Sequence, residues 1–146
     1  MKVSGIGIGI LICTALLVSG VSAQTIENTK IYTVMPAGNY HTSSLTPLVS
    51  SSISQGQIVP YSRVISPGTS SMIVDLNWVN TANSLSLTIV APDETLGPYY
   101  DISDGQIDGR ITLSISSSTG LTPGTWKFYV KGDRVSGVQT YNFITH

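Results

Sequence analysis

Strict alternation of apolar and polar side chains is the feature that most constrains how this chain folds. The pattern recurs between Ser71 and Phe143, and its clearest segments are residues 71–78, 84–89, 111–116 and 126–131. Successive side chains of a strand point to opposite faces, so a period of two predicts strands that are buried on one side and solvated on the other. Such strands are typical of an antiparallel sandwich or barrel. Trp78 and Trp126 share the phase of the apolar residues, so both are predicted to lie in the core.

About seven strands are expected. Residues 53–59 and 61–65, joined at Pro60, and residues 139–144 are the remaining candidates. Turns rich in Gly, Pro, Asp or Asn separate the strands at intervals of roughly ten residues, a spacing that fits a β-sandwich or jelly roll. No amphipathic helical stretch interrupts them. The predicted fold class is therefore all-β, with an antiparallel β-sandwich over residues 53–146.

The first 23 residues have the pattern of a signal peptide. Lys2 precedes an apolar stretch that is expected to form a hydrophobic signal helix, and small residues at Val21 and Ala23 suit cleavage before Gln24. The alternative is an uncleaved anchor, because residues 5–21 reach the lower limit of roughly 17 residues for a membrane span. Either way the chain is predicted to be exported, and to be secreted or held at the cell surface.

Residues 24–52 are interpreted as an N-terminal extension or spacer. The part from Pro36 onward is rich in Ser and Thr and contains no charged residue, so it offers little apolar surface to offset the entropy of ordering it. Residues 31–35 are one extended segment at most. The single cysteine, Cys13, lies in the predicted signal peptide, so the mature chain must be stabilised by sheet packing without disulfides.

Several motifs together resemble the bacterial and archaeal pre-peptidase C-terminal domain, a P-domain-like module. They are Ile53-Ser54-Gln55-Gly56-Gln57, Leu76-x-Trp78, the run from Ser84 to Asp93, and Gly120-Leu121-x-x-Gly124-Thr125-Trp126-x-Phe128-x-Val130. The resemblance covers roughly residues 53–144. It implies a jelly-roll-like, non-catalytic β-sandwich that aids secreted hydrolases or attaches to proteins and polysaccharides, and some relatives bind calcium. Glu94 departs from the usual glycine, and residues 96–109 form a longer, more acidic loop.

Three carboxylates in that loop are candidate calcium ligands. Asp101, Asp104 and Asp108 lie close together with Gly105 and Gly109, and calcium accepts a flexible set of carboxylate and carbonyl oxygens. The gaps of three and four residues do not match an EF-hand, which places Asp at every second position. The alternative is a pair of Asp-Gly turns, in which each carboxylate bonds nearby backbone and glycine adopts a positive φ. The turn interpretation is favoured.

Three tyrosines are candidate ligand contacts. Tyr129 alternates outward between Lys127 and Lys131, while Tyr99 and Tyr100 precede the acidic loop. Exposed aromatic rings stack on sugars or anchor a protein partner.

No enzyme is predicted. The only histidines of the mature chain, His41 and His146, lie in the spacer and at the last residue, where neither is expected to be held rigidly for a catalytic triad. Asp93 and Glu94 are neighbours in a turn, not a pair held across a cleft. An unrecognised extracellular hydrolase is the third hypothesis.

The predicted function is therefore a secreted, non-catalytic module that binds or attaches to extracellular protein or polysaccharide, or assists a secreted hydrolase. The alternative is a structural cell-envelope protein held at the membrane by its uncleaved N-terminal segment. The seven basic residues form no cluster, so nucleic acid is not an expected partner. No cofactor is required, and calcium is the one ion considered.

Overall fold

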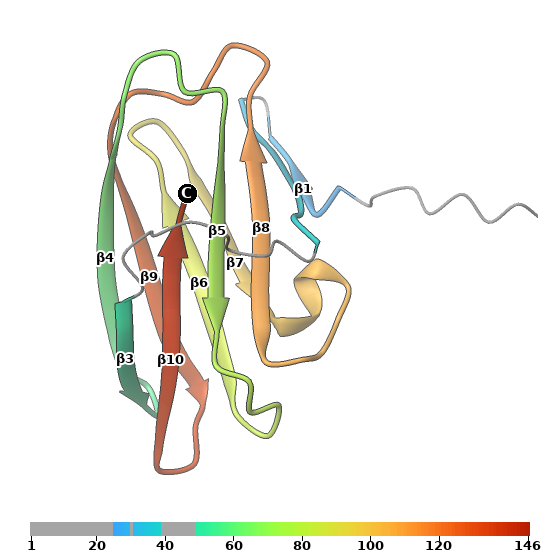
Figure 1. The fold of residues 1–146 in the computed structure, drawn as a ribbon, viewed down its shortest axis with the longest axis vertical. Coiled ribbons are helices and arrows are strands. Elements are labelled where there is room, and N and C mark those ends of the chain that lie inside the picture. Colours follow the sequence, from blue (N-terminus) through green and yellow to red (C-terminus); the bar gives the residue numbers. More distant parts are fainter. Residues whose placement is uncertain (1–24, 30, 39–48) are drawn as a thin grey trace, which may run out of the picture.

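The computed structural model describes residues 25–29, 31–38 and 49–146, and the predicted signal peptide lies outside these ranges. The described chain is all-β and forms two antiparallel sheets that pack face to face (Figure 1). The larger sheet has the order β1 (Glu27–Asn28), β2 (Thr33–Pro36), β8 (Arg110–Ser116), β5 (Ser71–Asn77), β10 (Val138–Thr145) and β3 (Val49–Ser54). The smaller sheet has the order β4 (Ile58–Ile65), β9 (Gly124–Arg134), β6 (Ser84–Val90) and β7 (Thr95–Tyr100).

Helical structure is minor in the described ranges. One 3₁₀ turn, η1 (Asp101–Asp104), follows β7. Within the same ranges no helix has the length and apolarity needed to cross a bilayer.

The predicted alternation places the core correctly. In β9, Trp126, Phe128 and Val130 are buried, while Lys127 and Lys131 are exposed on the outer face. The inward residues of both sheets form one continuous hydrophobic cluster. The β-sandwich is therefore confirmed, and so is the inward phase of its central strands.

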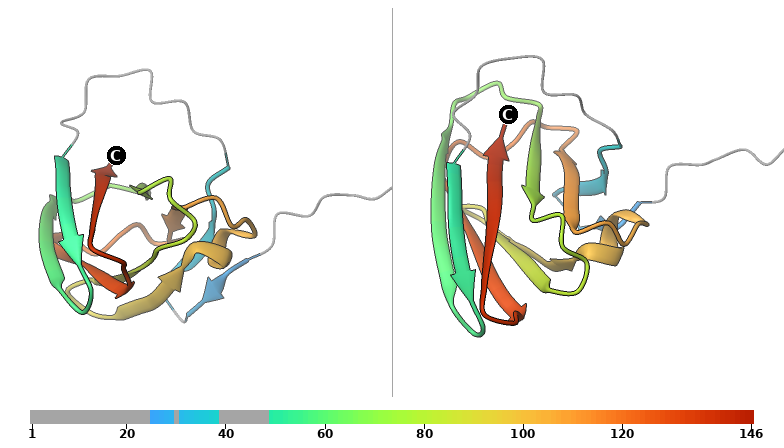
Figure 2. Two further views of the ribbon diagram at one scale, coloured as in Figure 1. Left: turned by 90° about the horizontal axis from the view of Figure 1, so that it is seen from below. Right: turned by 60° about the horizontal axis from the view of Figure 1, so that its bottom comes forward.

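The start of the sandwich differs from the expected strand over residues 53–59. Ile53 belongs to β3, which ends at Ser54 in the larger sheet; the chain turns at Gly56, and β4 begins at Ile58 in the smaller sheet. β4 then runs without a break through Pro60, because it is an edge strand and the missing N–H of proline faces no partner there. Figure 2 shows β3 and β4 side by side where the two sheets meet.

Residues 96–100, expected to belong to a loop, lie in the edge strand β7. Leu96 and Tyr99 both point into the core, and the pairing of β7 with β6 shifts its register between them. Gly97 and Pro98 obscured this strand, since this pair reads as a turn in isolation. An edge position tolerates both residues.

The spacer interpretation is wrong for the described residues in the range 27–52. β2 pairs with β8, and β3 pairs with β10, so both belong to the larger sheet. Tyr32 and Val34 are completely buried and supply inward side chains next to β8. Residues 39–48 lie outside the described ranges.

β1 and β2 pair as an N-terminal hairpin. Side-chain hydrogen bonds connect this hairpin to the smaller sheet. The acceptors are carboxylates, and two of them belong to the turn between β6 and β7. The donor–acceptor pairs are Tyr32–Asp93 at 2.6 Å, Thr29–Glu94 at 2.8 Å and Tyr99–Glu27. The hairpin thereby closes the side of the sandwich opposite the β3–β4 turn.

Candidate functional site

The acidic loop after β7 is organised by the carboxylate of Asp101. It accepts backbone N–H groups from Asp108 and Gly109 at 3.1 Å and from Arg110 at 3.3 Å. The carboxylate therefore folds the loop back on itself before β8 begins.

Asp104 performs a related role at the edge of β8. Its carboxylate accepts the N–H of Gln106 at 3.2 Å. It also accepts the N–H of Thr112 at 3.0 Å, and this residue of β8 lies just beyond the point where β2 ends. Burial raises the pKa of Asp104, the two backbone N–H groups oppose that shift, and the charges of Asp108 and Asp101 reinforce it. Asp104 thus satisfies backbone groups that β2 does not reach.

These contacts favour the turn interpretation of the loop. Gly105 and Gly109 have positive φ values of 92° and 77°, as expected of Asp-Gly turns. Among the described residues, no three His, Cys, Asp or Glu side chains are grouped so that they could hold a metal ion. Asp101 and Asp104 thus already accept backbone N–H groups, and calcium binding by Asp101, Asp104 and Asp108 stays a prediction.

A partly buried ion pair joins the start of β8, just after the loop, to β5 within the larger sheet. Nε and Nη2 of Arg110 donate to the two carboxylate oxygens of Asp75 at 2.8 and 2.7 Å. The alternation places Asp75 on the outer face of β5, yet it is only 7% exposed because Arg110 covers it. The bidentate geometry is a strong form of such a pair, and it anchors the first residue of β8.

Two of the three candidate tyrosines lie on the surface and one does not. Tyr99 is 2% exposed, and its hydroxyl donates to Glu27, so the prediction of an exposed ring is wrong there. Tyr100 is 44% exposed and Tyr129 is partly exposed. Both belong to the outer face of the smaller sheet.

We call that outer face the tyrosine face. Tyr129 lies near its centre, directly opposite Pro60 of β4 and Thr88 of β6. Tyr100 lies in a neighbouring row that also contains Lys131. The aromatic, basic and apolar members of the face that are exposed or partly exposed are Tyr100, Tyr129, Lys127, Lys131, Ile58, Pro60 and Val64.

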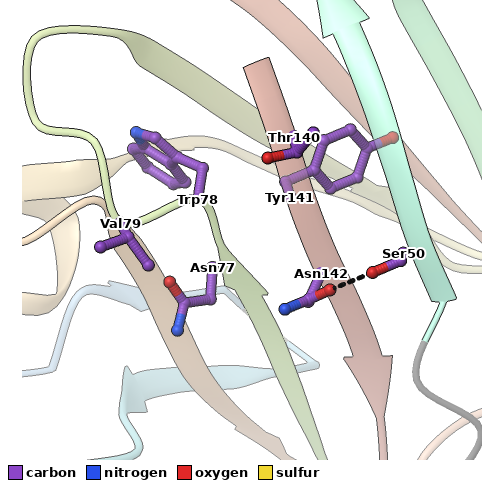
Figure 3. A pocket seen from close by; sticks show the side chains of 7 residues that line it. All are labelled: Ser50, Asn77, Trp78, Val79, Thr140, Tyr141 and Asn142. Atoms are coloured by element: carbon purple, nitrogen blue, oxygen red, sulfur yellow. Dashed lines mark hydrogen bonds between the residues drawn. The ribbon is translucent and has the colours of Figure 1, made fainter.

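A pocket of about 290 Å³ opens on the outer surface of the larger sheet (Figure 3). Most of its polar groups are amides and hydroxyls, so we call it the amide pocket. Its lining residues are Ser50, Asn77, Trp78, Val79, Thr140, Tyr141 and Asn142. None of these side chains carries a charge.

Strand register assembles the amide pocket. Asn142 of β10 is paired with Ser50 of β3 on one side and with Asn77 of β5 on the other. Ser50 Oγ donates to Asn142 Oδ1 at 2.6 Å, and in Figure 3 the amide nitrogen of Asn142 faces Asn77. Sequence reasoning missed this site because asparagine in a strand gives no signal until the neighbouring strands are known.

No protein-family model matches the chain, and no curated protein matches it significantly. The resemblance to pre-peptidase C-terminal domains therefore rests on the sequence motifs alone.

Proposed function

We propose that the chain is an exported, non-catalytic β-sandwich module that attaches to an extracellular protein through the tyrosine face. The observation that carries this proposal is the placement of Tyr129 and Tyr100 on one outer face, where both rings remain accessible. Tyrosine is enriched among the residues that dominate binding energy at protein interfaces.

The other groups on the tyrosine face suit a protein surface. Ile58 and Val64 are 55% and 70% exposed on β4, and Pro60 lies between them. Apolar groups around aromatic anchors exclude water from an interface. The exposed cation of Lys127 favours an acidic partner, whereas Lys131 already pairs with Asp133 at 2.7 Å. An acidic patch on a secreted hydrolase is the kind of partner that we expect.

The strand order supports a jelly-roll assignment for this module. Strands β3 to β10 are arranged as β8–β5–β10–β3 in one sheet and β4–β9–β6–β7 in the other. Two interleaved Greek keys of eight strands produce a double sheet of this kind. This topology agrees with the family that the motifs resemble, and such modules place their contacts on outer faces and loops.

Site-specific photo-crosslinking tests the proposed attachment. A photoreactive amino acid at Thr88, beside Tyr129, is expected to crosslink a defined secreted protein, whereas one at Thr140 on the opposite sheet is expected not to. Tyr129→Ala combined with Lys127→Glu should abolish the crosslink, and Asn142→Ala should leave it intact. Equal products from Thr88 and Thr140, or no protein product at all, would overturn the proposal.

The membrane-anchored alternative is separated by the N-terminus of the exported form. N-terminal sequencing should find Gln24 if the predicted signal peptide is removed. A form that starts at Met1 and sediments with membranes would instead support a structural cell-envelope protein.

A further inference from the structure

We infer that the amide pocket binds an uncharged sugar ring of an extracellular glycan. This binding site lies on the opposite sheet from the tyrosine face and does not depend on the proposed protein contact. The module would then connect a protein on one face to a glycan on the other.

The chemistry of the pocket matches a sugar. The side-chain amide of Asn77 presents two donors and an acceptor, and the hydroxyl of Thr140 adds both functions. Because Ser50 donates to the amide oxygen of Asn142, Asn142 presents mainly its N–H donors and Ser50 presents its oxygen as an acceptor. A sugar ring carries hydroxyl groups that need donors and acceptors in alternation around its edge. Because no charged side chain lines the pocket, nothing there favours an ionic ligand.

The size and orientation of the pocket support this assignment. Its volume of about 290 Å³ lies near the lower end of the range of roughly 300–1,000 Å³ for small-molecule sites, which suits about one ring. The bond from Ser50 fixes the amide of Asn142 before a ligand arrives. Within the described part of the chain, the amide of Asn77 makes no side-chain hydrogen bond. Fixed polar groups lower the entropic cost of binding.

Val79 supplies an exposed apolar wall in a strained conformation. It is 74% exposed and has φ +63°, which is a rare conformation for a β-branched residue. The N–H groups of Trp78 and Val79 both donate to the carbonyl of Gly109, at 2.8 and 2.9 Å. Strained residues persist only where the surroundings enforce them, and they concentrate at ligand sites. An exposed apolar side chain held in this way suits the C–H face of a sugar ring.

The acidic loop acts as the support of this wall. Asp101 accepts the N–H of Gly109, and the carbonyl of Gly109 holds Val79. A side chain at position 109 would place its Cβ 2.6 Å from the backbone of Val79. Asp101 is therefore a positioning residue for the pocket, which gives the loop a role without a metal.

The floor of the pocket is rigid as well. The indole N–H of Trp78 donates to the carbonyl of Asn83 at 3.2 Å, and Gln139 Nε2 donates to the carbonyl of Trp78 at 3.0 Å. Asn83 and Gln139 also bond each other at 2.7 Å and are both buried. A fixed floor keeps the lining groups at their positions in the absence of ligand.

NMR titration of the mature chain tests the inference directly. The probes are neutral oligosaccharides of glucose, mannose and N-acetylglucosamine, with oligogalacturonate as the charged comparison. At least one neutral probe is expected to shift the side-chain amide signals of Asn77 and Asn142 and the methyl signals of Val79. Shifts with oligogalacturonate alone, shifts confined to the tyrosine face, or no shift with any probe would each overturn the inference.

Matched variants separate the pocket from the rest of the surface. Asn77→Ala should weaken binding of that neutral probe by roughly five- to tenfold, as expected for the loss of one or two hydrogen bonds. Val79→Gly should weaken binding while raising the melting temperature, because glycine relieves the strain. Tyr129→Ala should bind the sugar as the unsubstituted chain does. Unchanged affinity in both pocket variants would overturn the inference and leave the crosslinking test of the tyrosine face unaffected.

Discussion

Trp126 connects the predicted sandwich to the N-terminal segment at the scale of a single residue. Its ring is fully buried and lies edge-to-face against Tyr32, with centroids 5.2 Å apart. Its indole N–H donates to the carbonyl of Thr122 at 2.9 Å. One side chain thus links β9, the turn before it and the residue that precedes β2.

Trp126→Ala is expected to reduce the free energy of unfolding by about 3–5 kcal/mol, because it leaves a large cavity in the core. Chemical denaturation measures this loss. Lys127→Ala, on the outer face of the same strand, should stay within about 0.5 kcal/mol of the unsubstituted chain. A loss below about 1 kcal/mol for Trp126→Ala would contradict its place in the core.

Two glycines of the acidic loop form a matched pair. Gly105 and Gly109 both have positive φ, but a Cβ at Gly105 meets nothing within 4 Å, whereas one at Gly109 meets the backbone of Val79. Gly105→Ala should cost about 1–2 kcal/mol, which is the cost of the left-handed conformation alone. Gly109→Ala should cost clearly more, because the β5–β6 loop must move. Equal melting temperatures for the two variants would contradict this contact.

At the scale of elements, the acidic loop is stabilised by its own backbone. We expect a calcium titration of chelator-treated protein to leave the melting temperature unchanged, because Asp101 and Asp104 already accept backbone N–H groups. A bound ion at a hundred times its Kd would add about 2.7 kcal/mol. A rise of several degrees with calcium but not with magnesium would therefore restore the calcium hypothesis.

The N-terminal hairpin is part of the folded unit. Deleting residues 24–52 should abolish cooperative unfolding, since it removes the buried side chains of Tyr32 and Val34 together with β2 and most of β3. The point variant Tyr32→Ala should lose about 3–5 kcal/mol, whereas Ile31→Ala, at an exposed neighbour, should change little. A truncated chain that still unfolds cooperatively would show that the sandwich does not need the hairpin.

At the scale of the whole molecule, buried tyrosine hydroxyls couple stability to pH. Burial raises the pKa of Tyr32, Tyr99 and Tyr141, and hydrogen bonds to Asp93, Glu27 and Tyr61 respectively add to the shift. Each hydroxyl therefore ionises more easily in the unfolded chain than in the native one. The contribution of each hydroxyl to the free energy of unfolding is complete below the pKa of about 10 that it has in the unfolded chain. This contribution is lost as the pH rises through the pKa that the hydroxyl has in the folded protein.

The free energy of unfolding should therefore fall steadily above about pH 10. Denaturation at a series of pH values measures this decline, and Tyr141→Phe should make it shallower because one ionising group is gone. A pH titration of the native protein followed by tyrosinate absorbance should show a second transition at higher pH, in which the buried tyrosines ionise. A flat stability profile up to about pH 11 would contradict the burial of these hydroxyls.

The sequence alone determined the fold class and the inward face of the central strands. Alternation is a local property, so β5, β6, β8, β9 and β10 could be found from a few residues each. Composition misled at β2, β3 and β7, where Ser, Gly or Pro suppressed the local signal. These strands are ordered by partners far along the chain, as when Tyr32, just before β2, packs against Trp126.

Only the tertiary structure decided where binding chemistry lies. Ser50 and Asn142 are 92 residues apart, yet they share one hydrogen bond because β3 and β10 pair in a particular register. Tyr99 and Tyr100 are adjacent in sequence, yet one is buried and the other exposed, because the pleat of β7 separates them. A strand's own sequence specifies which side chains share a face. Pairing with distant strands specifies what those side chains meet.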